Sequence, residues 1–299
     1  MKRTTLNYFK SIGRQFNSTE ELRALIESDL KKDLHMHTCF SDGALTPKQI
    51  IDWRKSQGYE LLAITDHDGI EGSVLVAPYA EHVGVQFLYG IEFDSADPIG
   101  KNIHMLGYGF DPDDPDLKAA LLGIILDRAR RNDRFMKALV DKGYDITLDD
   151  IGTVNEGRFV GKPTFALILM RKGYVDSVQE AFNTIFQEPE IKCIEKTTLP
   201  TTKVIDIIHK AGGLAVVAHP MEQRRRKETF EEFKPRLYAF LDKMVEYGVD
   251  GVECHHPSAD PVQQEMLVAY AKEHGLMITR GSDFHSDETK RDFKRYHRP

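Results

Sequence analysis

Short apolar strand patterns alternate with amphipathic helix patterns along most of this chain, and this alternation restricts its fold more than any other feature. It is clear at 31–112, where the helix pattern "TPKQIIDWRKSQG" is followed by the strand pattern "YELLAITDHD", and it returns at 197–299. Such alternation is typical of a mostly parallel sheet, either open or closed into a barrel. We therefore predict an α/β protein built on one such sheet.

A purely helical stretch separates the two alternating parts. Its longest element is "DLKAALLGIILDRARRNDRFMKALVDKGY", and the whole chain of 299 residues is long enough for one large domain that carries an insertion. The division that we predict is an N-terminal helical extension at 1–30, a barrel formed by 31–112 and 197–299, and a small helical insertion at 113–196.

Composition and cysteine spacing narrow the class of protein. The formal net charge of −7 argues against a surface that coats nucleic acid, although it leaves room for a local basic pocket. Cys39, Cys193 and Cys254 are far apart and show no C-x-x-C spacing, as in proteins of a reducing compartment. The N-terminal stretch lacks a continuous apolar run, and no segment approaches the roughly 20 apolar residues of a membrane span. We expect a cytoplasmic protein.

Imidazole and carboxylate side chains recur where predicted strands end. In "DLHMHTCFSDG" (33–43), His35 and His37 point to the same side of a strand, because side chains alternate along it. The other such positions are Asp66 with His67, Glu92, His219, and Asp283 with His285. His104 is the exception, since it lies early in its own predicted strand.

These groups together indicate a metal site. Loops at the carboxyl ends of parallel strands converge on one mouth. Nitrogen and oxygen ligands without thiolates suit zinc, manganese or iron at a catalytic site. Each motif alone has an ordinary explanation, such as a polar strand end or a capped turn, but five strand ends with the same ligand types favour a metal centre.

The motifs "DLHMHTCFSDG", "ITDHD", "GIEFD", "AHP" and "GSDFH", in this order, resemble those of the PHP (polymerase and histidinol phosphatase) family of metal-dependent phosphoesterases. The likeness covers roughly 33–111 and 197–286. The insertion segment "VGKPTFALILMRKGYVDSVQEAFNTIF" resembles the helical insert of the nucleotide-phosphatase and 5′→3′ exoribonuclease branch. The resemblance implies a distorted seven-stranded β/α barrel with an inserted helical domain, in agreement with the alternation.

The resemblance also implies three divalent metal ions, which would be manganese, zinc or iron. The ligands that it implies are His35, His37, Glu92 and Asp283 for the first ion, Glu92, His104 and His219 for the second, and Asp42, His67 and His285 for the third. Three such ions outweigh the three carboxylates, so the site would attract a phosphate ester even in an acidic protein. A water bound between two ions would lose a proton near neutral pH and become the nucleophile.

Two carboxylates, Asp66 and Asp68, flank His67 and are the candidates for further catalytic roles. Either could act as general acid or orient a metal ligand, and orienting is what ligating imidazoles usually require.

Basic and imidazole side chains near the motifs are candidates for substrate binding. They are Arg158, Lys162, Arg224, Arg225 and His255. An arginine would pair bidentately with a second phosphate, although a solvated loop explains each residue equally well. The branch pattern usually reads Gly-Arg-Pro-His where this chain has Gly-Lys-Pro-Thr at 161–164, which argues against identical substrate handling. The segment "RARR" (128–131) lies in a helix that is also rich in acids, so we expect a solvated helix face there.

The function that follows is a metal-dependent phosphoesterase acting on a phosphate monoester of a small metabolite, with a nucleotide such as a nucleoside 3′,5′-bisphosphate as the preferred class. Alternatives within this chemistry are a cyclic sugar phosphate and the 5′ end of a short RNA, and hydrolysis of a C–N bond is a more distant one. From another class, the chain could be a non-catalytic metal-binding regulatory module. The presence of a suitable side chain at every ligand position argues against that module.

Overall fold

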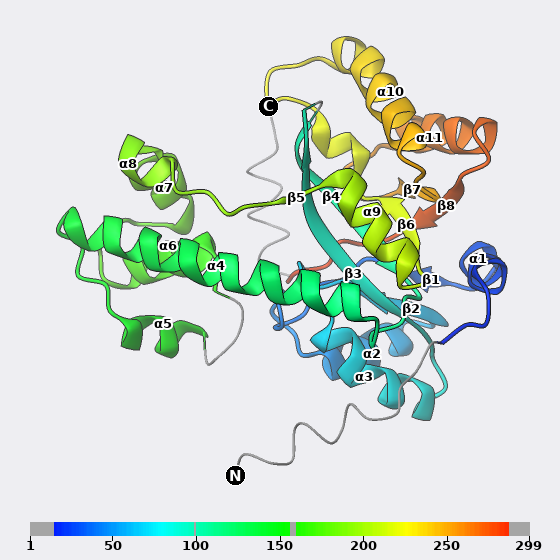
Figure 1. Ribbon diagram of the computed structural model, residues 1–299, viewed down its shortest axis with the longest axis horizontal. Helices are drawn as coiled ribbons and strands as arrows, with labels where there is room; N and C mark the ends of the chain where they lie inside the picture. Colours follow the sequence, from blue (N-terminus) through cyan, green and yellow to red (C-terminus); the bar gives the residue numbers. More distant parts are fainter. Residues whose placement is uncertain (1–14, 99, 156–159, 287–299) are drawn as a thin grey trace. The chain divides into compact units, whose positions relative to one another are not determined.

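The computed structural model describes residues 15–98, 100–155 and 160–286 (Figure 1). Within these ranges, none of the helices has both the length and the apolar character that crossing a bilayer demands. The chain divides into two compact units, the first made of 1–120 and 199–299 and the second of 121–198.

The first unit is built on a mixed sheet. Its strands, in their order across the sheet, are β1 (Lys32–Asp33), β2 (Leu61–Ile64), β3 (Gln86–Asp97), β4 (Gly100–Tyr108), β6 (Leu214–Val217), β7 (Gly251–His255) and β8 (Met277–Arg280), and β5 (Leu199–Pro200) pairs with β3. Neighbouring strands are parallel except for β4, which runs antiparallel to both β3 and β6.

The two edges of this sheet are joined by the segments that follow β1 and β8. The backbone N–H of Asp283 donates to the carbonyl of His35 over 2.9 Å, and the N–H of His37 donates to the carbonyl of Phe284 over 2.9 Å. A Cβ atom at Gly281 would lie 2.1 Å from the Cβ of His35, so this close approach requires glycine. The seven strands thus form a nearly closed barrel, which confirms the predicted α/β barrel.

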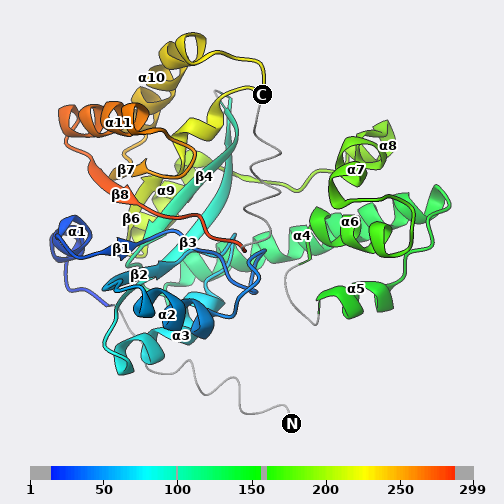
Figure 2. The ribbon, with the colours of Figure 1, turned by 180° about the vertical axis from the view of Figure 1, so that it is seen from behind.

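Helices cover the outside of the barrel between successive strands. They are α2 (Pro47–Ser56), α3 (Glu71–His82), α9 (Thr201–Lys210), α10 (Phe230–Glu246) and α11 (Pro261–Glu273). α3 packs on β2 and β3, α9 on β3, β4 and β6, and α11 on β7 and β8 (Figures 1 and 2). Side chains cap the N-terminal ends of several of these helices. Thr46 caps α2 by accepting from the backbone N–H of Gln49, and Asp260 caps α11 by accepting from the backbone N–H of Gln263.

The helix α1 (Thr19–Glu27) contributes directly to the barrel's core. The Ser18 side chain caps it by accepting from the backbone N–H of Glu21. Leu22 and Ile26 have no exposed area and pack in the same cluster as strand residues such as Leu61. Burial of these side chains stabilises the fold by about 1.5–3 kcal/mol each.

The second unit is a helical bundle. It contains most of α4 (Pro115–Asp141), followed by α5 (Leu148–Asn155), α6 (Lys162–Arg171), α7 (Val178–Asn183), the short 3-10 helix η1 (Ile185–Gln187) and α8 (Pro189–Lys192). Its core contains Phe135 and Leu139 of α4 together with Phe165 and Leu169 of α6.

One expectation for this unit is wrong. Arg128 and Arg131 are only 9% and 5% exposed, whereas Arg130 is exposed. The physical reason is helical periodicity: residues 128 and 131 lie three positions apart, and Phe135 follows Arg131 by four, so all three share the face that packs inward.

Candidate metal centre

The side chains expected to bind metal come from different strands but lie at one end of the barrel. His35 and His37 follow β1, and His219 follows β6. His104 lies early in β4, yet it pairs across the sheet with Asp94, near the end of β3. Because β4 runs antiparallel to β3, the beginning of β4 lies at the carboxyl end of β3. This explains why His104 joins the other side chains although it does not lie at the end of its own strand.

Four ligand atoms converge in a first cluster. The Nε2 atoms of His35 and His37 lie 3.1 Å apart. Oε2 of Glu92 lies 3.3 and 3.1 Å from these nitrogens, and Oδ1 of Asp283 lies 3.4 and 3.2 Å from them. Two ligand atoms that each lie about 2.1 Å from the same ion are separated by about 3 Å, which matches the distance between these two ring nitrogens. The four atoms therefore fit a single cation.

The other oxygen of Glu92 belongs to a second cluster. Oε1 lies 2.9 Å from Nδ1 of His104 and 3.0 Å from Nε2 of His219, and these two nitrogens are 3.2 Å apart. One carboxylate thus faces two ligand groups, which is the arrangement of a bridging ligand.

A third, wider cluster surrounds Asp42. Its Oδ1 lies 3.3 Å from Nε2 of His285, and its Oδ2 lies 3.8 Å from Nε2 of His67. Nδ1 of His37 also faces Asp42, at 3.6 Å, and the rings of His37 and His285 stack with centroids 4.1 Å apart. His37 therefore lies between the first and the third cluster.

Buried nitrogen atoms without hydrogen bonds support the fit of cations. Nδ1 of His37 and Nδ1 of His219 are buried and have no hydrogen-bond partner in the described part of the chain. Buried polar atoms are nearly always paired, so the unpaired Nδ1 of His37, which faces Asp42 of the third cluster, indicates a missing partner there. The atom of His219 that faces the second cluster is its other nitrogen, Nε2. The donor set of imidazoles and carboxylates is one that binds divalent ions.

The charges of the metal-free site also balance one another. Burial acts to lower the pKa of His219, but the carboxylates of Glu222 and Glu92 outweigh it and raise the pKa to about 9. In the same way Asp42 outweighs burial at His285 and raises its pKa to about 9. Burial acts to raise the pKa of Glu92, but the surrounding imidazoles hold it well below its ordinary value. Without a bound ion, these raised pKa values favour protons on His219 and His285.

Metal binding should consequently tighten as the pH rises. Below pH 9 the rings of His219 and His285 carry protons in the metal-free protein, and an ion must displace them. We expect the apparent affinity to rise by up to about tenfold per pH unit for each displaced proton, between about pH 7 and pH 9. Chelator competition at several pH values measures this, and an affinity that does not change with pH would contradict it.

A buried carboxylate that the sequence analysis did not single out supports the first cluster. Glu253 of β7 is fully buried, and its two oxygens lie 3.0 and 3.2 Å from Nδ1 of His35. Its Oε2 also accepts from the backbone N–H of His219 over 2.8 Å. It fixes the ring of His35 so that Nε2 faces the cluster. An acid in an apolar strand marked Glu92, and the same signal in "VDGVECHH" could have found Glu253.

Asp94, which is partly exposed, is a second carboxylate that the sequence analysis did not single out. Its Oδ1 lies 3.1 Å from Nδ1 of His67 and 3.5 Å from Nε2 of His104. The other nitrogen of His67 faces the third cluster, and the other nitrogen of His104 faces the second. One carboxylate therefore orients imidazoles of two clusters.

Replacing Asp94 by Asn should weaken metal binding by about 10- to 100-fold, because a neutral amide polarises and orients the two imidazoles less well. Metal content after dialysis against a weak chelator measures this. Asp52→Asn, at an exposed carboxylate paired with Lys48, is the matched control and should bind metal normally. Equal metal content in the two variants would refute the role of Asp94.

Asp66 and Asp68 each accept a hydrogen bond from a backbone N–H. Asp66 is buried and accepts from the N–H and the hydroxyl of Thr38 over 2.8 and 2.7 Å and from the hydroxyl of Ser41 over 2.6 Å. Oδ1 of Asp68 accepts from the backbone N–H of Asp94 over 3.0 Å. These contacts hold the chain segments that carry ligands, so the geometry favours orienting over acid catalysis.

The candidates for substrate binding are dispersed. Arg158 lies outside the described residues. Lys162 is half-buried in the second unit. Arg224 and Arg225 are exposed, just after the 3-10 helix η2 (Pro220–Gln223).

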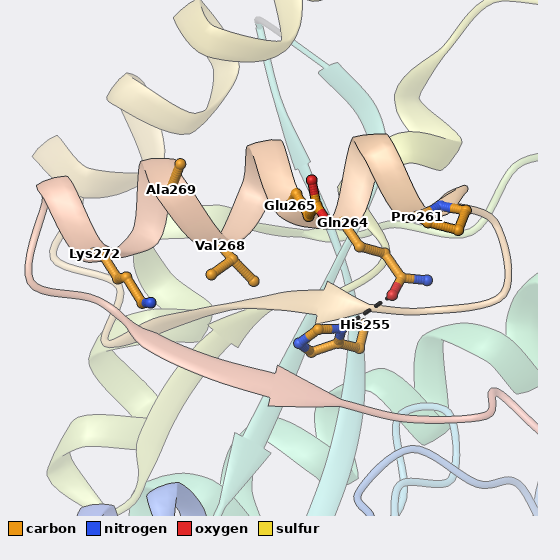
Figure 3. Close-up of a pocket in the computed structure, with 7 residues that line it drawn as sticks. All are labelled: His255, Pro261, Gln264, Glu265, Val268, Ala269 and Lys272. Carbon is orange, nitrogen blue, oxygen red and sulfur yellow. Dashed lines mark hydrogen bonds between the residues drawn. The ribbon is translucent and has the colours of Figure 1, made fainter.

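His255 does not join the clusters. It lies in a pocket of about 540 Å³ against α11, where its Nδ1 is 3.0 Å from Oε1 of Gln264 (Figure 3). Its neighbour His256 is buried instead among the ligands, with Nε2 3.4 Å from Oδ2 of Asp283. The pairing of β7 with β8 shifts register between Glu253 and His255, so simple alternation could not tell which of the two histidines faces the site. The substrate-binding role of His255 stays a prediction.

Comparison with known proteins agrees with this site. The PHP domain family model matches residues 33–251. Three curated bacterial relatives each match 85% of this chain. They are a 5′-3′ exoribonuclease of Haemophilus influenzae (30% identical, 90% of its length), a phosphoribosyl 1,2-cyclic phosphate 1,2-diphosphodiesterase of Eggerthella lenta (28%, 94%) and a 3′,5′-nucleoside bisphosphate phosphatase of Chromobacterium violaceum (29%, 87%).

A solved structure is similar over most of the chain. It is that of an amidohydrolase from Chromobacterium violaceum with bound sulfate and no metal, with a TM-score of 0.73, 27% identity, and coverage of 87% of this chain and 89% of that one. The family model spans most of the chain, and the clusters of imidazoles and carboxylates supply the ligands that such enzymes need. The chain therefore belongs to the PHP domain family and is a metal-dependent phosphoesterase.

Proposed function

We propose that this enzyme removes a phosphate monoester from a phosphorylated nucleotide, with a nucleoside 3′,5′-bisphosphate as the preferred substrate, using three divalent ions. The observation that carries the proposal is the division of nine ligand residues into three clusters joined by Glu92 and by His37. Bound manganese, zinc or iron would supply a hydroxide at neutral pH and positive charge for the phosphate oxygens.

The residues of the chain would divide the remaining work. The first cluster would hold one ion through His35, His37, Glu92 and Asp283, the second another through Glu92, His104 and His219, and the third the last through Asp42, His67 and His285. Glu253 and Asp94 would fix the direction of the ligating rings, and Asp66 and Asp68 would hold the segments around them.

Substrate selection would fall to basic side chains outside the clusters. Arg224, Arg225, Lys162 and Arg158 are the candidates for gripping a second phosphate, because a guanidinium or ammonium group pairs with it. The helical insertion, 113–196, would contribute to this selection. We place the enzyme in the cytoplasm.

The names of the relatives support a nucleotide substrate. One relative is a phosphatase of nucleoside bisphosphates and another is an exoribonuclease, so both act on phosphorylated nucleotides or chains of them. The Eggerthella lenta relative supports a second candidate, a cyclic phosphate of a sugar.

A substrate screen tests the proposal. Metal-loaded enzyme would be given adenosine 3′,5′-bisphosphate, adenosine 3′-monophosphate, a phosphoribosyl cyclic phosphate and a 5′-phosphorylated oligoribonucleotide, and the release of phosphate or of mononucleotide would be measured. We expect kcat/KM for the bisphosphate to exceed the others by about tenfold or more, which corresponds to about 1.4 kcal/mol. Preference for the cyclic phosphate or the oligonucleotide would select that alternative. Absence of turnover with every one of these substrates would favour the non-catalytic regulatory module.

A further inference from the structure

His256, which directly follows β7, is a buried histidine that the three clusters leave unused. It is 5% exposed, and its ring centroid lies 6.1 Å from that of His35 in the first cluster and 5.3 Å from that of His219 in the second. Its Nε2 atom is buried and makes no hydrogen bond with any described residue, although Oδ2 of Asp283 lies 3.4 Å away. A buried polar atom without a partner costs stability, so its presence beside a reactive site requires a reason.

The turn that follows β7 fixes the direction of this ring. The backbone N–H of Ala259 donates to the carbonyl of His256 over 3.0 Å, and Pro257 occupies the second position of the turn, which its fixed φ favours. The backbone N–H of Ser258 donates to Nδ1 of His256 over 3.1 Å, and Oγ of Ser258 lies 2.7 Å from the same nitrogen. With Nδ1 held by the turn, Nε2 is the ring nitrogen left beside the first cluster.

These contacts decide which nitrogen of His256 carries the proton. A backbone N–H can only donate, so Nδ1 must be an acceptor and carries no proton. The neutral ring has a single N–H group, which is therefore at Nε2. A protonated ring nitrogen has no free lone pair for a metal ion. Nε2 of His256 is thus a hydrogen-bond donor and not a ligand atom.

His35 has the opposite arrangement, as a ligand requires. Its Nδ1 lies 3.0 Å from Oε1 of Glu253, and a carboxylate accepts a hydrogen bond from a nitrogen that carries a proton. The proton of this ring is therefore held at Nδ1, and Nε2 is free to bind an ion. Two neighbouring histidines at the same site thus present different groups to it, a lone pair from His35 and an N–H from His256.

We propose that His256 contacts the substrate, by donating a hydrogen bond from Nε2 to an oxygen of its phosphate group. A ring nitrogen of His256, one of His35 and a carboxylate oxygen of Asp283 lie within 4.8 Å of one another, so His256 borders the first cluster. A hydrogen bond to a charged oxygen is stronger than one between neutral groups, and it would pair the buried N–H. The inference rests on the phosphoesterase activity and not on the choice of a nucleotide as the substrate.

Two substitutions separate the turn from the donor. Asparagine places an oxygen close to the position of Nδ1, so His256→Asn can still accept from the N–H of Ser258 but has no donor at the position of Nε2. Glutamine is longer, and its amide NH₂ reaches that position, so His256→Gln keeps a donor. His209→Asn is the matched control, because this histidine bonds to Asp250 outside all three clusters.

Thermal unfolding of the full-length, metal-loaded protein with increasing inorganic phosphate measures the contact, and elemental analysis measures bound metal. We expect His256→Asn to raise the apparent dissociation constant for phosphate about tenfold, as for the loss of a hydrogen bond to a charged group, and to keep the metal content of the parent. His256→Gln should recover most of the affinity. His209→Asn should match the parent in both measurements.

The contrary results are distinct. If His256→Asn binds phosphate as tightly as the parent, the histidine is only a structural part of the turn and the proposal is wrong. If His256→Asn loses metal, His256 acts as a ligand or positions one, which also overturns it. A metal-loaded parent whose unfolding temperature does not respond to phosphate rejects the contact as well.

Kinetics separate this inference from the proposed function. With any phosphate ester that the enzyme hydrolyses, His256→Asn should raise KM about tenfold and change kcat little, because the phosphate oxygen is charged in both the substrate and the transition state. A KM equal to that of the parent would reject the contact. If adenosine 3′,5′-bisphosphate is not hydrolysed, the proposed substrate is wrong, whereas the phosphate titration still decides the role of His256.

Discussion

Replacing His37 by Ala should abolish turnover, with kcat/KM falling by about 10³-fold or more, while the protein stays folded. The ring of His37 contributes Nε2 to the first cluster and faces Asp42 of the third with Nδ1, so its removal would damage two of the proposed metal sites at once. Loss of one group that stabilises developing charge costs about 10²- to 10³-fold, and loss of an ion costs more. Phosphate release and elemental analysis of bound metal measure the two effects together.

Asp283→Ala should give the same result, because Asp283 belongs to the first cluster. His209→Ala is the matched control: this histidine lies at the end of α9 and bonds to Asp250, outside all three clusters. The control should keep its activity and its metal. Circular dichroism would verify that all variants are folded, and an active His37→Ala enzyme that needs no metal would disprove the assignment.

Replacing Arg54 by Leu should lower the free energy of unfolding by about 3–5 kcal/mol, because it leaves a buried carboxylate unpaired. Asp33 is 2% exposed, and its Oδ2 lies 2.7 Å from Nη2 of Arg54. Burial raises the pKa of Asp33, and Arg54 opposes that rise, so without the arginine the carboxylate must either protonate or stay charged at high cost. Chemical denaturation measures the change.

Two comparisons make this test specific. Lys48→Leu removes the exposed ion pair with Asp52 on the same helix and should cost at most about 1 kcal/mol. The double variant Asp33→Asn, Arg54→Leu should recover part of the stability lost in Arg54→Leu, since the unpaired charge is gone. A loss in Arg54→Leu no larger than that in Lys48→Leu would show that the buried pair contributes nothing.

The ion pair of Asp33 and Arg54 also contacts the segment that carries Asp283. Nη2 of Arg54 also donates to the hydroxyl oxygen of Ser282 over 2.7 Å, and Oδ1 of Asp33 accepts from the backbone N–H of Ser282 over 2.8 Å. Ser282 directly precedes Asp283, a predicted metal ligand, so we expect Arg54→Leu also to weaken metal binding.

The sequence predicted the barrel because each strand and helix has a local pattern, and side chains at strand ends necessarily gather at one edge. It could not explain His104, because the direction of β4 depends on its pairing with β3 and β6 and not on its own residues. The same limit applies at β7, where a shift in register decides that His256 and not His255 faces the ligands.

Side chains that act through other side chains were harder to predict. No sequence motif singled out Glu253 or Asp94. Their roles become visible only in the structure, where they contact the rings of His35, His67 and His104. The buried position of Arg131 was missed for a different reason: its charge suggests solvent, while its spacing from Phe135 places it on the packed face of α4.

The hydrogen bonds between the segments after β1 and β8 have a consequence for how the enzyme matures. His35 and His37 are translated early, whereas Asp283, whose N–H bonds to the carbonyl of His35, is translated almost 250 residues later. A nascent chain on the ribosome therefore has half of a chelating site long before the other half exists. The first cluster can therefore be complete only after the segment that carries Asp283 has left the ribosome.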